Sequence, residues 1–268
     1  MPLVFAAIMP HGDELLPFTA PGPGLLPLRR AMESIGAAMR AARPDVLVIA
    51  SPHHLRIPGH LAIVDTVHAA GCVESGAGNY ARDVRIDRGF NRVLADAAAE
   101  SGLPPVRVGY LTSEGDLSCL PLDFGSLVPL YYLIGADEAP AVCVVGPPRD
   151  LGLRPLERFG AALAARCAER RVAFVASADQ AHAHDAGGPY GFDPAAARYD
   201  ALVQDAVRAG DLSPLLGLDS AFLDAAKPDA PWQMAILAGL LGGPRAAHDF
   251  TYARPTYFGM LTARFADA

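Results

Sequence analysis

Histidine is the residue type whose placement in this sequence most clearly indicates chemistry. The chain has eight histidines, and five of them fall in three short polar segments: His11 in the first, His53 and His54 in the second, and His182 and His184 in the third. Imidazole is a neutral ligand suited to zinc or iron, and two histidines with one carboxylate leave coordination positions open for substrate and dioxygen. The clustering therefore predicts a metal site.

Motifs of competing chemistries are absent from the sequence. It contains no GxSxG nucleophile elbow, no P-loop, no GxGxxG phosphate-binding turn and no HExxH zinc motif. The four cysteines form no CxxC pair, so we expect reduced thiols rather than a zinc ribbon or a dithiol redox site. Any metal must therefore be held by residues that are distant in sequence.

Short apolar runs alternate along the chain with longer stretches of helical spacing. The runs that predict buried strands are 3–8, 46–49, 61–64, 141–145 and 172–176. Helical spacing extends over residues 28–42, 88–101, 126–134, 156–170, 194–209 and 232–241. This alternation predicts an α/β fold with a central parallel or mixed sheet covered by helices on both faces. Ligands bind at the carboxyl ends of the strands in such a sheet, and the histidine segments follow the first, second and last of the five runs.

Composition limits the class of protein. The 268 residues are 51% hydrophobic and contain no repeat or low-complexity linker, so we expect one domain over residues 1–268. With 22 basic and 29 acidic residues the net charge is −7, which disfavours nucleic acid or an anionic membrane as the main partner. The amino-terminal segment lacks a basic region and its apolar run is broken by Pro10, His11 and Asp13. We therefore expect neither a signal peptide nor a membrane span, and a cytoplasmic location.

Five segments, taken in order, resemble a known family over most of the chain. They are MPHGDELLP at 9–17, SPHH at 51–54, LDFGSLVPL at 122–130, SADQAHAHDAGGPYGFDP at 177–194 and AKPDAPWQMAILAG at 226–239. Together they resemble the LigB-type class III extradiol ring-cleavage dioxygenases, whose wider superfamily includes the Memo proteins. Each segment is weak alone, whereas five in the right order are specific.

The resemblance implies a set of metal ligands. In that family a histidine after the first strand and one in the second segment bind non-haem Fe(II), which implies His11 and His53, with His54 as the adjacent alternative. The third ligand is usually a glutamate before a helix near the carboxyl end, and the matching stretch here offers Asp229. Aspartate is one methylene shorter but supplies the same hard oxygen, so a two-histidine, one-carboxylate site is retained. The alternative interpretation of Asp229 is an N-cap or first-turn acid of the helix that follows.

The resemblance also implies catalytic and substrate-binding residues. The family's acid/base histidine corresponds to His182, with His184 as the fallback, and a histidine can take a proton from a catechol hydroxyl at neutral pH. The alternative for His182 is a structural hydrogen bond to Asp179. Tyr190 is expected as an aromatic wall or hydrogen-bond donor of the substrate pocket. Many relatives carry histidine where this chain has Phe124, a position that is thought to help bind substrate or oxygen.

The function implied by the resemblance is ring cleavage of a catechol-like or 2-aminophenol-like substrate by dioxygen, with Fe(II) as cofactor and zinc or manganese as alternatives. The expected partners are the small aromatic diol and O2, and self-association or a sister subunit is also expected. Two other functions remain open at this point. One is a Memo-like or non-catalytic metal-binding subunit, and the other is a zinc-dependent hydrolase on the same fold.

Overall fold

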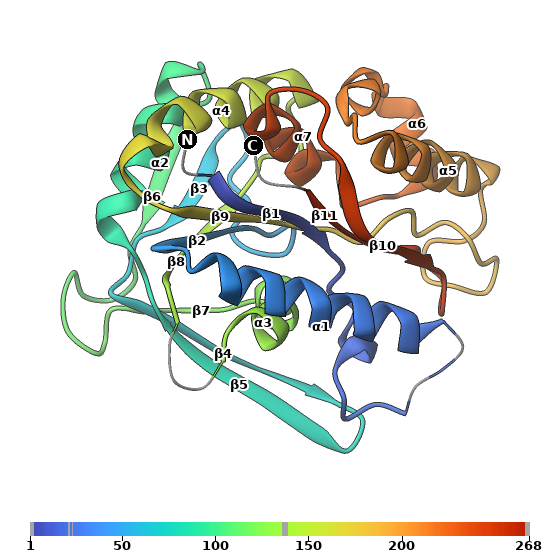
Figure 1. Ribbon diagram of the computed structural model, residues 1–268, viewed down its shortest axis with the longest axis horizontal. Helices are drawn as coiled ribbons and strands as arrows, with labels where there is room; N and C mark the ends of the chain where they lie inside the picture. The colour runs from blue at the N-terminus through green and yellow to red at the C-terminus, as the bar shows by residue number, and fades with distance from the viewer. Residues whose placement is uncertain (1–2, 21, 23, 136–138, 266–268) are drawn as a thin grey trace.

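Strands and helices alternate to build a central sheet with helices on both faces (Figure 1). The structure, a computed structural model, describes residues 3–20, 22, 24–135 and 139–265. The strands within these residues are β1 (Leu3–Met9), β2 (Val46–Ala50), β3 (Leu61–Val64), β4 (His68–Ser75), β5 (Gly78–Arg85), β6 (Pro105–Val108), β7 (Cys119–Pro121), β8 (Ala141–Gly146), β9 (Val172–Ser177), β10 (Ala247–Ala253) and β11 (Met260–Phe265). The α-helices are α1 (Leu25–Ala42), α2 (Arg88–Glu100), α3 (Phe124–Leu133), α4 (Leu153–Arg166), α5 (Pro194–Ala209), α6 (Ser220–Ala226) and α7 (Pro231–Leu241).

The central sheet has eight strands in the order β10-β11-β1-β9-β2-β8-β3-β6. Its middle four strands, β1, β9, β2 and β8, are mutually parallel, while β11 is antiparallel to β1 and β3 is antiparallel to β8. The four middle strands are almost completely buried, because helices cover both of their faces. The sheet is therefore mixed and the predicted α/β class is confirmed.

Two layers of helices bury the two faces of this sheet. One hydrophobic cluster joins alternate side chains of the strands to α2, α4, α5 and α7, and the other joins the opposite side chains to α1 and α3. A three-stranded sheet of order β5-β4-β7 lies beyond α3 (Figure 1). Its strand β4 reaches the site described below through Val73. The predicted coverage of both faces by helices is confirmed.

The five predicted strands and six predicted helices are all present, with bounds that differ by a few residues. The strands that the sequence did not predict are β4, β5, β6, β7, β10 and β11. Several of these are partly exposed or short, so they lack the continuous apolar run that revealed the buried strands. The short helix α6 was missed for the same reason, since within it only Ala226 is buried.

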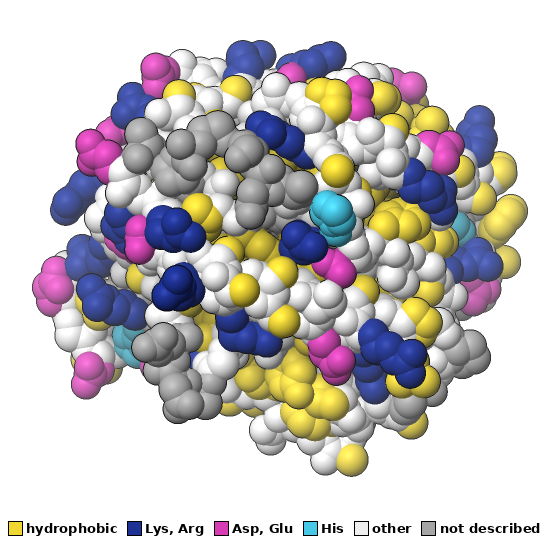
Figure 2. Space-filling view, viewed as in Figure 1, with side chains coloured by type: hydrophobic (Ala, Val, Ile, Leu, Met, Phe, Trp, Pro, Cys, Tyr) yellow, Lys and Arg dark blue, Asp and Glu magenta, His cyan; other side chains and the backbone are white. Residues whose placement is uncertain are grey.

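The outer surface carries mixed charge. Figure 2 shows Lys and Arg side chains interspersed with Asp and Glu over one face of the molecule, with apolar side chains in small groups between them. Among the residues that the structure describes, no helix is both long enough and apolar enough to cross a bilayer.

Helices α4 and α7 approach each other closely through two glycines. A methyl group on Gly239 of α7 would collide with the carbonyl oxygen of Glu157 in α4, and one on Gly160 of α4 would collide with the carbonyl of Ile236. Both obstacles are backbone atoms, which cannot move aside without separating the helices. This contact holds α7 against α4 and so helps to place the loop that precedes α7.

We expect Gly239→Ala to destabilise the protein. Although alanine has the better helix propensity, the collision with backbone should lower the free energy of unfolding by about 1–3 kcal/mol, as overpacking of cores commonly does. Urea unfolding followed by circular dichroism measures the change. Gly217→Ala is the control, because open space surrounds Gly217, and it should stay within about 0.5 kcal/mol of the parent. Equal stability of the two variants would contradict the close helix contact.

Candidate metal centre and its cavity

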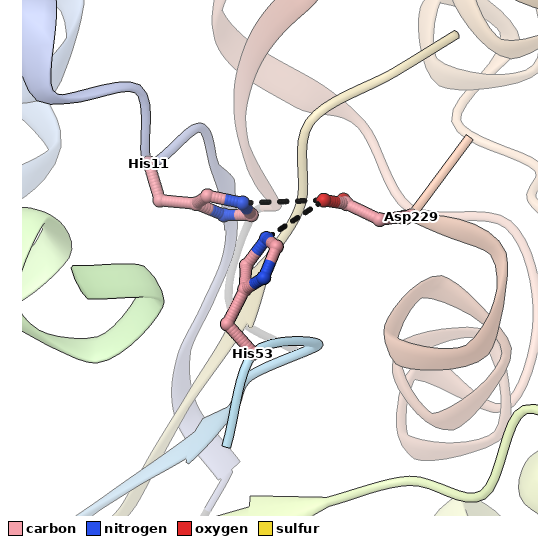
Figure 3. A group of neighbouring side chains, drawn as sticks. All are labelled: His11, His53 and Asp229. Carbon is pink, nitrogen blue, oxygen red and sulfur yellow. Dashed lines mark hydrogen bonds and ion pairs between the residues drawn. The ribbon is translucent and has the colours of Figure 1, made fainter. Parts of the chain in front are cut away.

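Loops that follow three neighbouring strands meet at one edge of the central sheet. Strands β1, β9 and β2 lie side by side and parallel, so their carboxyl ends share this edge. His11 follows β1, Asp179 follows β9 and His53 follows β2. The loop between α6 and α7 brings Asp229 to the same place (Figure 3). The edge therefore collects side chains that are up to 218 residues apart (229 − 11).

Hydrogen bonds fix the orientation of the His11 ring. Its Nδ1 lies 2.9 Å from Oγ of Ser177, and this hydroxyl donates to the carbonyl of Gly125 at 2.5 Å. Because the serine proton is used on Gly125, Nδ1–H of His11 must be the donor to Ser177. The other nitrogen, Nε2, consequently faces the candidate site.

Three side chains gather around a common point. Nε2 of His53 lies 3.1 Å from Oδ2 of Asp229, and Nε2 of His11 lies 3.3 Å from the same oxygen (Figure 3). Nε2 of His11 is also 3.3 Å from Oδ2 of Asp179. Despite these distances, Nε2 of His11 makes no hydrogen bond of normal geometry within the described residues. It is directed between its acidic neighbours rather than at either one.

The fit of this group to a metal ion follows from those distances. Ligand bonds of about 2.1 Å at tetrahedral or octahedral angles place ligand atoms about 3.0–3.4 Å apart, and the distances from Oδ2 of Asp229 to the two histidine nitrogens lie in this range. The candidate ligand atoms of His11, His53 and Asp229 all lie within 4.8 Å of one another. A metal ligand requires an imidazole nitrogen with a free lone pair. Nε2 of His11 meets this requirement, because it is buried, has no hydrogen bond within the described residues and belongs to the tautomer with its proton on Nδ1. The residues therefore fit a two-histidine, one-carboxylate metal site.

Burial and close charges perturb the proton affinities of the group. Burial disfavours the charged form of His11, but the carboxylates of Asp179 and Asp229 outweigh it and raise the pKa of His11 to about 9. Burial and the charge of Asp229 raise the pKa of Asp179 to about 7, against the opposing charge of His11. Burial also acts to raise the pKa of Asp229, but the charge of His11 and the bond to His53 hold this pKa well below its usual range. The carboxylates of Asp179 and Asp229 thus favour a proton on His11, and this positive charge lies where a bound metal cation would lie.

Asp229 does not cap the helix that follows it. The N-cap residue of α7 is Ala230, and no side chain caps this helix. Instead, Oδ1 of Asp229 accepts a hydrogen bond of 3.0 Å from the backbone N–H of Asp179. Gln233, one turn into α7, donates to the carbonyls of Asp229 and Ser177 at 2.9 Å each. These contacts aim the carboxylate of Asp229 at the two histidines.

A cavity of about 400 Å³ opens beside these side chains. The described residues that line it are His11, Gly12, Asp13, Glu14, His53, Val73, Phe124, Asp179, His182, Tyr190, Tyr257 and Phe258. The ring of Phe124 lies 4.3 Å from that of His53, measured between centroids. Phe124 and Tyr190 thus lie where substrate-contacting residues were expected.

His182 lies across the cavity in an aromatic setting. Its ring stacks on Phe258 with a centroid distance of 5.1 Å and meets the edge of Tyr190 at 5.4 Å. Nδ1 is buried and makes no hydrogen bond, so the alternative of a structural pair with Asp179 is not observed. Burial lowers the pKa of His182 below its usual value of 6.5, which keeps the ring neutral at neutral pH.

Two other histidines of the predicted set lie elsewhere. Nε2 of His184 lies 2.8 Å from Oδ2 of Asp200, and its Nδ1 accepts from Arg254 at 3.0 Å, so both ring nitrogens are engaged outside the cavity. Nε2 of His54 donates to the carbonyl of Pro121 at 3.2 Å, and its Nδ1 accepts from its neighbour's N–H. His54 lines a separate cavity of about 450 Å³. The geometry thus favours His53 over His54 as the ligand, and His182 over His184 as the acid/base.

Several residues of the site escaped the sequence analysis. Ser177, Gln233 and Gly125 orient ligands, and Tyr257 and Phe258 form a wall of the cavity. Ser177, Gln233 and Gly125 lie inside the five family segments, so membership of these segments could have marked them as residues of the site. Tyr257 and Phe258 lie in the turn before β11, a strand that the sequence did not reveal, and no motif marked them.

The fold and these side chains define an α/β protein with a candidate two-histidine, one-carboxylate metal site. Residues 6–262 match the family described as the catalytic LigB subunit of aromatic ring-opening dioxygenase. The chain therefore belongs to the LigB family, and the resemblance found in the sequence is confirmed.

Two further comparisons describe relatives of the chain. Protein CA_C1420 of Clostridium acetobutylicum is 22% identical over 219 residues, which are 81% of this chain and 47% of that protein. The chain thus spans about half the length of this curated relative. The crystal structure of the uncharacterized protein JW3007 from Escherichia coli K12 has a TM-score of 0.59 at 15% identity and covers 97% of this chain and 98% of that one. At this identity the likeness concerns the fold.

We expect His11→Ala and His53→Ala to abolish tight metal binding. Each removes one of three ligands, so affinity for Fe(II) should fall by roughly 100-fold or more, beyond what changes around a ligand cause. Anaerobic equilibrium dialysis followed by elemental analysis measures the bound metal. His54→Ala is the matched control, since its ring nitrogens bind backbone groups, and it should retain the metal. Full metal content in His53→Ala with loss in His54→Ala would reverse the assignment.

Proposed function

We propose that this protein is a non-haem Fe(II)-dependent extradiol dioxygenase that cleaves the ring of a catechol-like or 2-aminophenol-like substrate. The observation that carries the proposal is the group of His11, His53 and Asp229, whose two histidines line an aromatic-walled cavity. Membership of the LigB family supports a ring-opening dioxygenase reaction. The expected product is a ring-opened semialdehyde acid that contains both atoms of O2.

His11, His53 and Asp229 would hold the Fe(II) by two nitrogens and one oxygen. Three protein ligands leave coordination positions free for the two oxygens of a diol and for dioxygen. Bound Fe(II) would supply the electron exchange between ring and dioxygen, which no side chain can provide. Ser177 keeps His11 in the tautomer that presents Nε2, and Gln233 keeps the loop of Asp229 in place.

His182 is assigned the proton transfers. Its lowered pKa keeps it unprotonated at neutral pH, so it can accept the proton of a substrate hydroxyl and return it later. Its ring lies in the cavity wall, and its buried Nδ1 makes no hydrogen bond to the described residues. Stacking on Phe258 holds the imidazole in one orientation.

Aromatic side chains would position the substrate ring and limit water. Phe124 lies over His53 on one side of the cavity, while Tyr190, Tyr257 and Phe258 surround His182 on the other. A flat substrate ring packs well against such faces, because offset and edge contacts between aromatic rings are favourable. The imidazole of His53 is about a quarter exposed, at 26%, which leaves the ligand group open toward the cavity.

The decisive experiment is anaerobic reconstitution with Fe(II), followed by oxygen-electrode and absorbance assays on catechols and 2-aminophenols. We expect oxygen uptake with a yellow ring-opened product. One tightly bound metal without oxygen uptake would instead favour the zinc-dependent hydrolase, tested with ester and amide substrates. Bound metal with neither oxygen uptake nor hydrolysis would favour a Memo-like or non-catalytic metal-binding subunit, and absence of bound metal would contradict the proposal.

His182→Ala should retain the metal and lose turnover. Removal of a general acid/base typically lowers the rate by about 10²–10⁴-fold, and the three ligands are untouched. Steady-state oxygen consumption gives kcat, and elemental analysis of the same sample gives the metal content. His248→Ala is the control, since His248 is exposed on β10. A fully active His182→Ala variant would overturn the acid/base assignment.

A further inference from the structure

Asp200 on α5 is a buried carboxylate to which the proposed reaction assigns no step. The residue is 2% exposed. Its Oδ1 accepts the backbone N–H of Ala181 at 2.9 Å. Its Oδ2 lies 2.8 Å from Nε2 of His184 and accepts the hydroxyl of Tyr252 at 2.5 Å. Three groups therefore converge on one carboxylate, and two of them belong to the residues on either side of the segment that presents His182.

The partners of His184 determine which of its nitrogens carries the proton. Nδ1 of His184 lies 3.0 Å from Nη1 of Arg254. A guanidinium group can only donate, so Nδ1 is the acceptor and Nε2 carries the proton that is donated to Asp200. Both oxygens of Asp200 thus act as acceptors toward buried groups. Only a carboxylate at this position can accept all three hydrogen bonds, because an amide offers one oxygen and an NH2 donor.

Asp200 also lies beside the turn that carries the stacking partner of His182. The N–H of Gly259 donates to the carbonyl of Ala181 at 3.0 Å. A methyl group on Gly259 would collide with Oδ2 of Asp200, so the carboxylate packs directly on this turn. The ring of Phe258, the preceding residue, stacks on His182. Asp200 therefore contacts both the segment that carries His182 and the turn that holds its ring.

We propose that Asp200 is a positioning residue that holds His182 in place for proton transfer. The inference rests on the proposed function, in which His182 is the acid/base. Asp200 is not among the described residues that line the cavity, so it acts through His182 and not on the substrate. A general acid/base must lie within hydrogen-bond reach of the proton that it moves, and a misplacement of about 1 Å can lower a rate by about 10²-fold.

Asp200→Asn tests the inference with little change in side-chain volume. Whichever way the amide points, its NH2 group faces a buried donor, so one bond to the segment of His182 is replaced by a donor–donor contact. We expect kcat for oxygen uptake by the Fe(II) protein with a catechol to fall by about 10–100-fold. The metal content from elemental analysis and the KM for the catechol should stay near the parent values, because the ligands are untouched.

A double-mutant cycle with His182→Ala separates positioning from general damage. In the His182→Ala background there is no acid/base left to misplace, so Asp200→Asn should not lower the residual rate further. A fall by the same factor in both backgrounds would mean that Asp200 only supports the fold, and it would overturn the inference. Asp205→Asn is the matched control, since it alters an exposed carboxylate of the same helix, and it should leave kcat unchanged.

A second variant keeps the test decisive if Asp200→Asn does not fold, which circular dichroism would show. His184→Leu removes one bond of the segment and leaves Asp200 bonded to Ala181 and Tyr252. We expect it to lower kcat in the parent and not in the His182→Ala background. An active parent whose kcat is unaffected by these variants would overturn the inference and leave the dioxygenase proposal standing. A parent without oxygen uptake would overturn both.

Discussion

The burial of opposite charges at the carboxyl edge of the sheet is the constraint on which the site depends. His11, Asp179 and Asp229 are each almost fully buried, and a buried charge without a partner costs several kcal/mol. Each carboxylate therefore also accepts a backbone N–H: Asp179 from His11, and Asp229 from Asp179. These two bonds link the ends of β1 and β9 to the loop before α7. The same contacts that make burial tolerable thus set the spacing of the candidate metal ligands.

The segment that carries His182 is held as firmly as the ligands. The N–H of Ala178 donates to Met9, that of Gln180 to Gly259, and that of His182 to Ala226. Asp200, itself buried, accepts from the N–H of Ala181 and bonds to the ring of His184. This explains why the second histidine of the segment has a structural place while the first lines the cavity.

The chain departs from its family pattern at two positions, and the structure gives a local account of both. Asp229 is shorter than the usual glutamate, and it nevertheless reaches the two histidines, because its loop is tied by Gln233 and by the N–H of Asp179. Phe124 replaces a histidine common in relatives, and its ring packs on His53 instead of offering a hydrogen bond. The cavity consequently has an aromatic contact at Phe124 in place of a hydrogen-bonding imidazole.

The sequence by itself determined the fold class, the family and the residues that meet at the edge of the sheet. Buried parallel strands are continuous apolar runs, and ligands gather at their carboxyl ends, so the histidines after β1, β2 and β9 could be assigned to one place. Only the tertiary structure showed that His53 and not His54 lies against Asp229, that His182 and not His184 lines the cavity, and that Asp229 is not the N-cap of α7. In each case the residues are adjacent or ambiguous in sequence, and what separates them is the direction of a side chain and the partners it meets. The strand β11 lacked a continuous apolar run because Thr262 and Arg264 interrupt it, although most of the strand is buried and it pairs with β1.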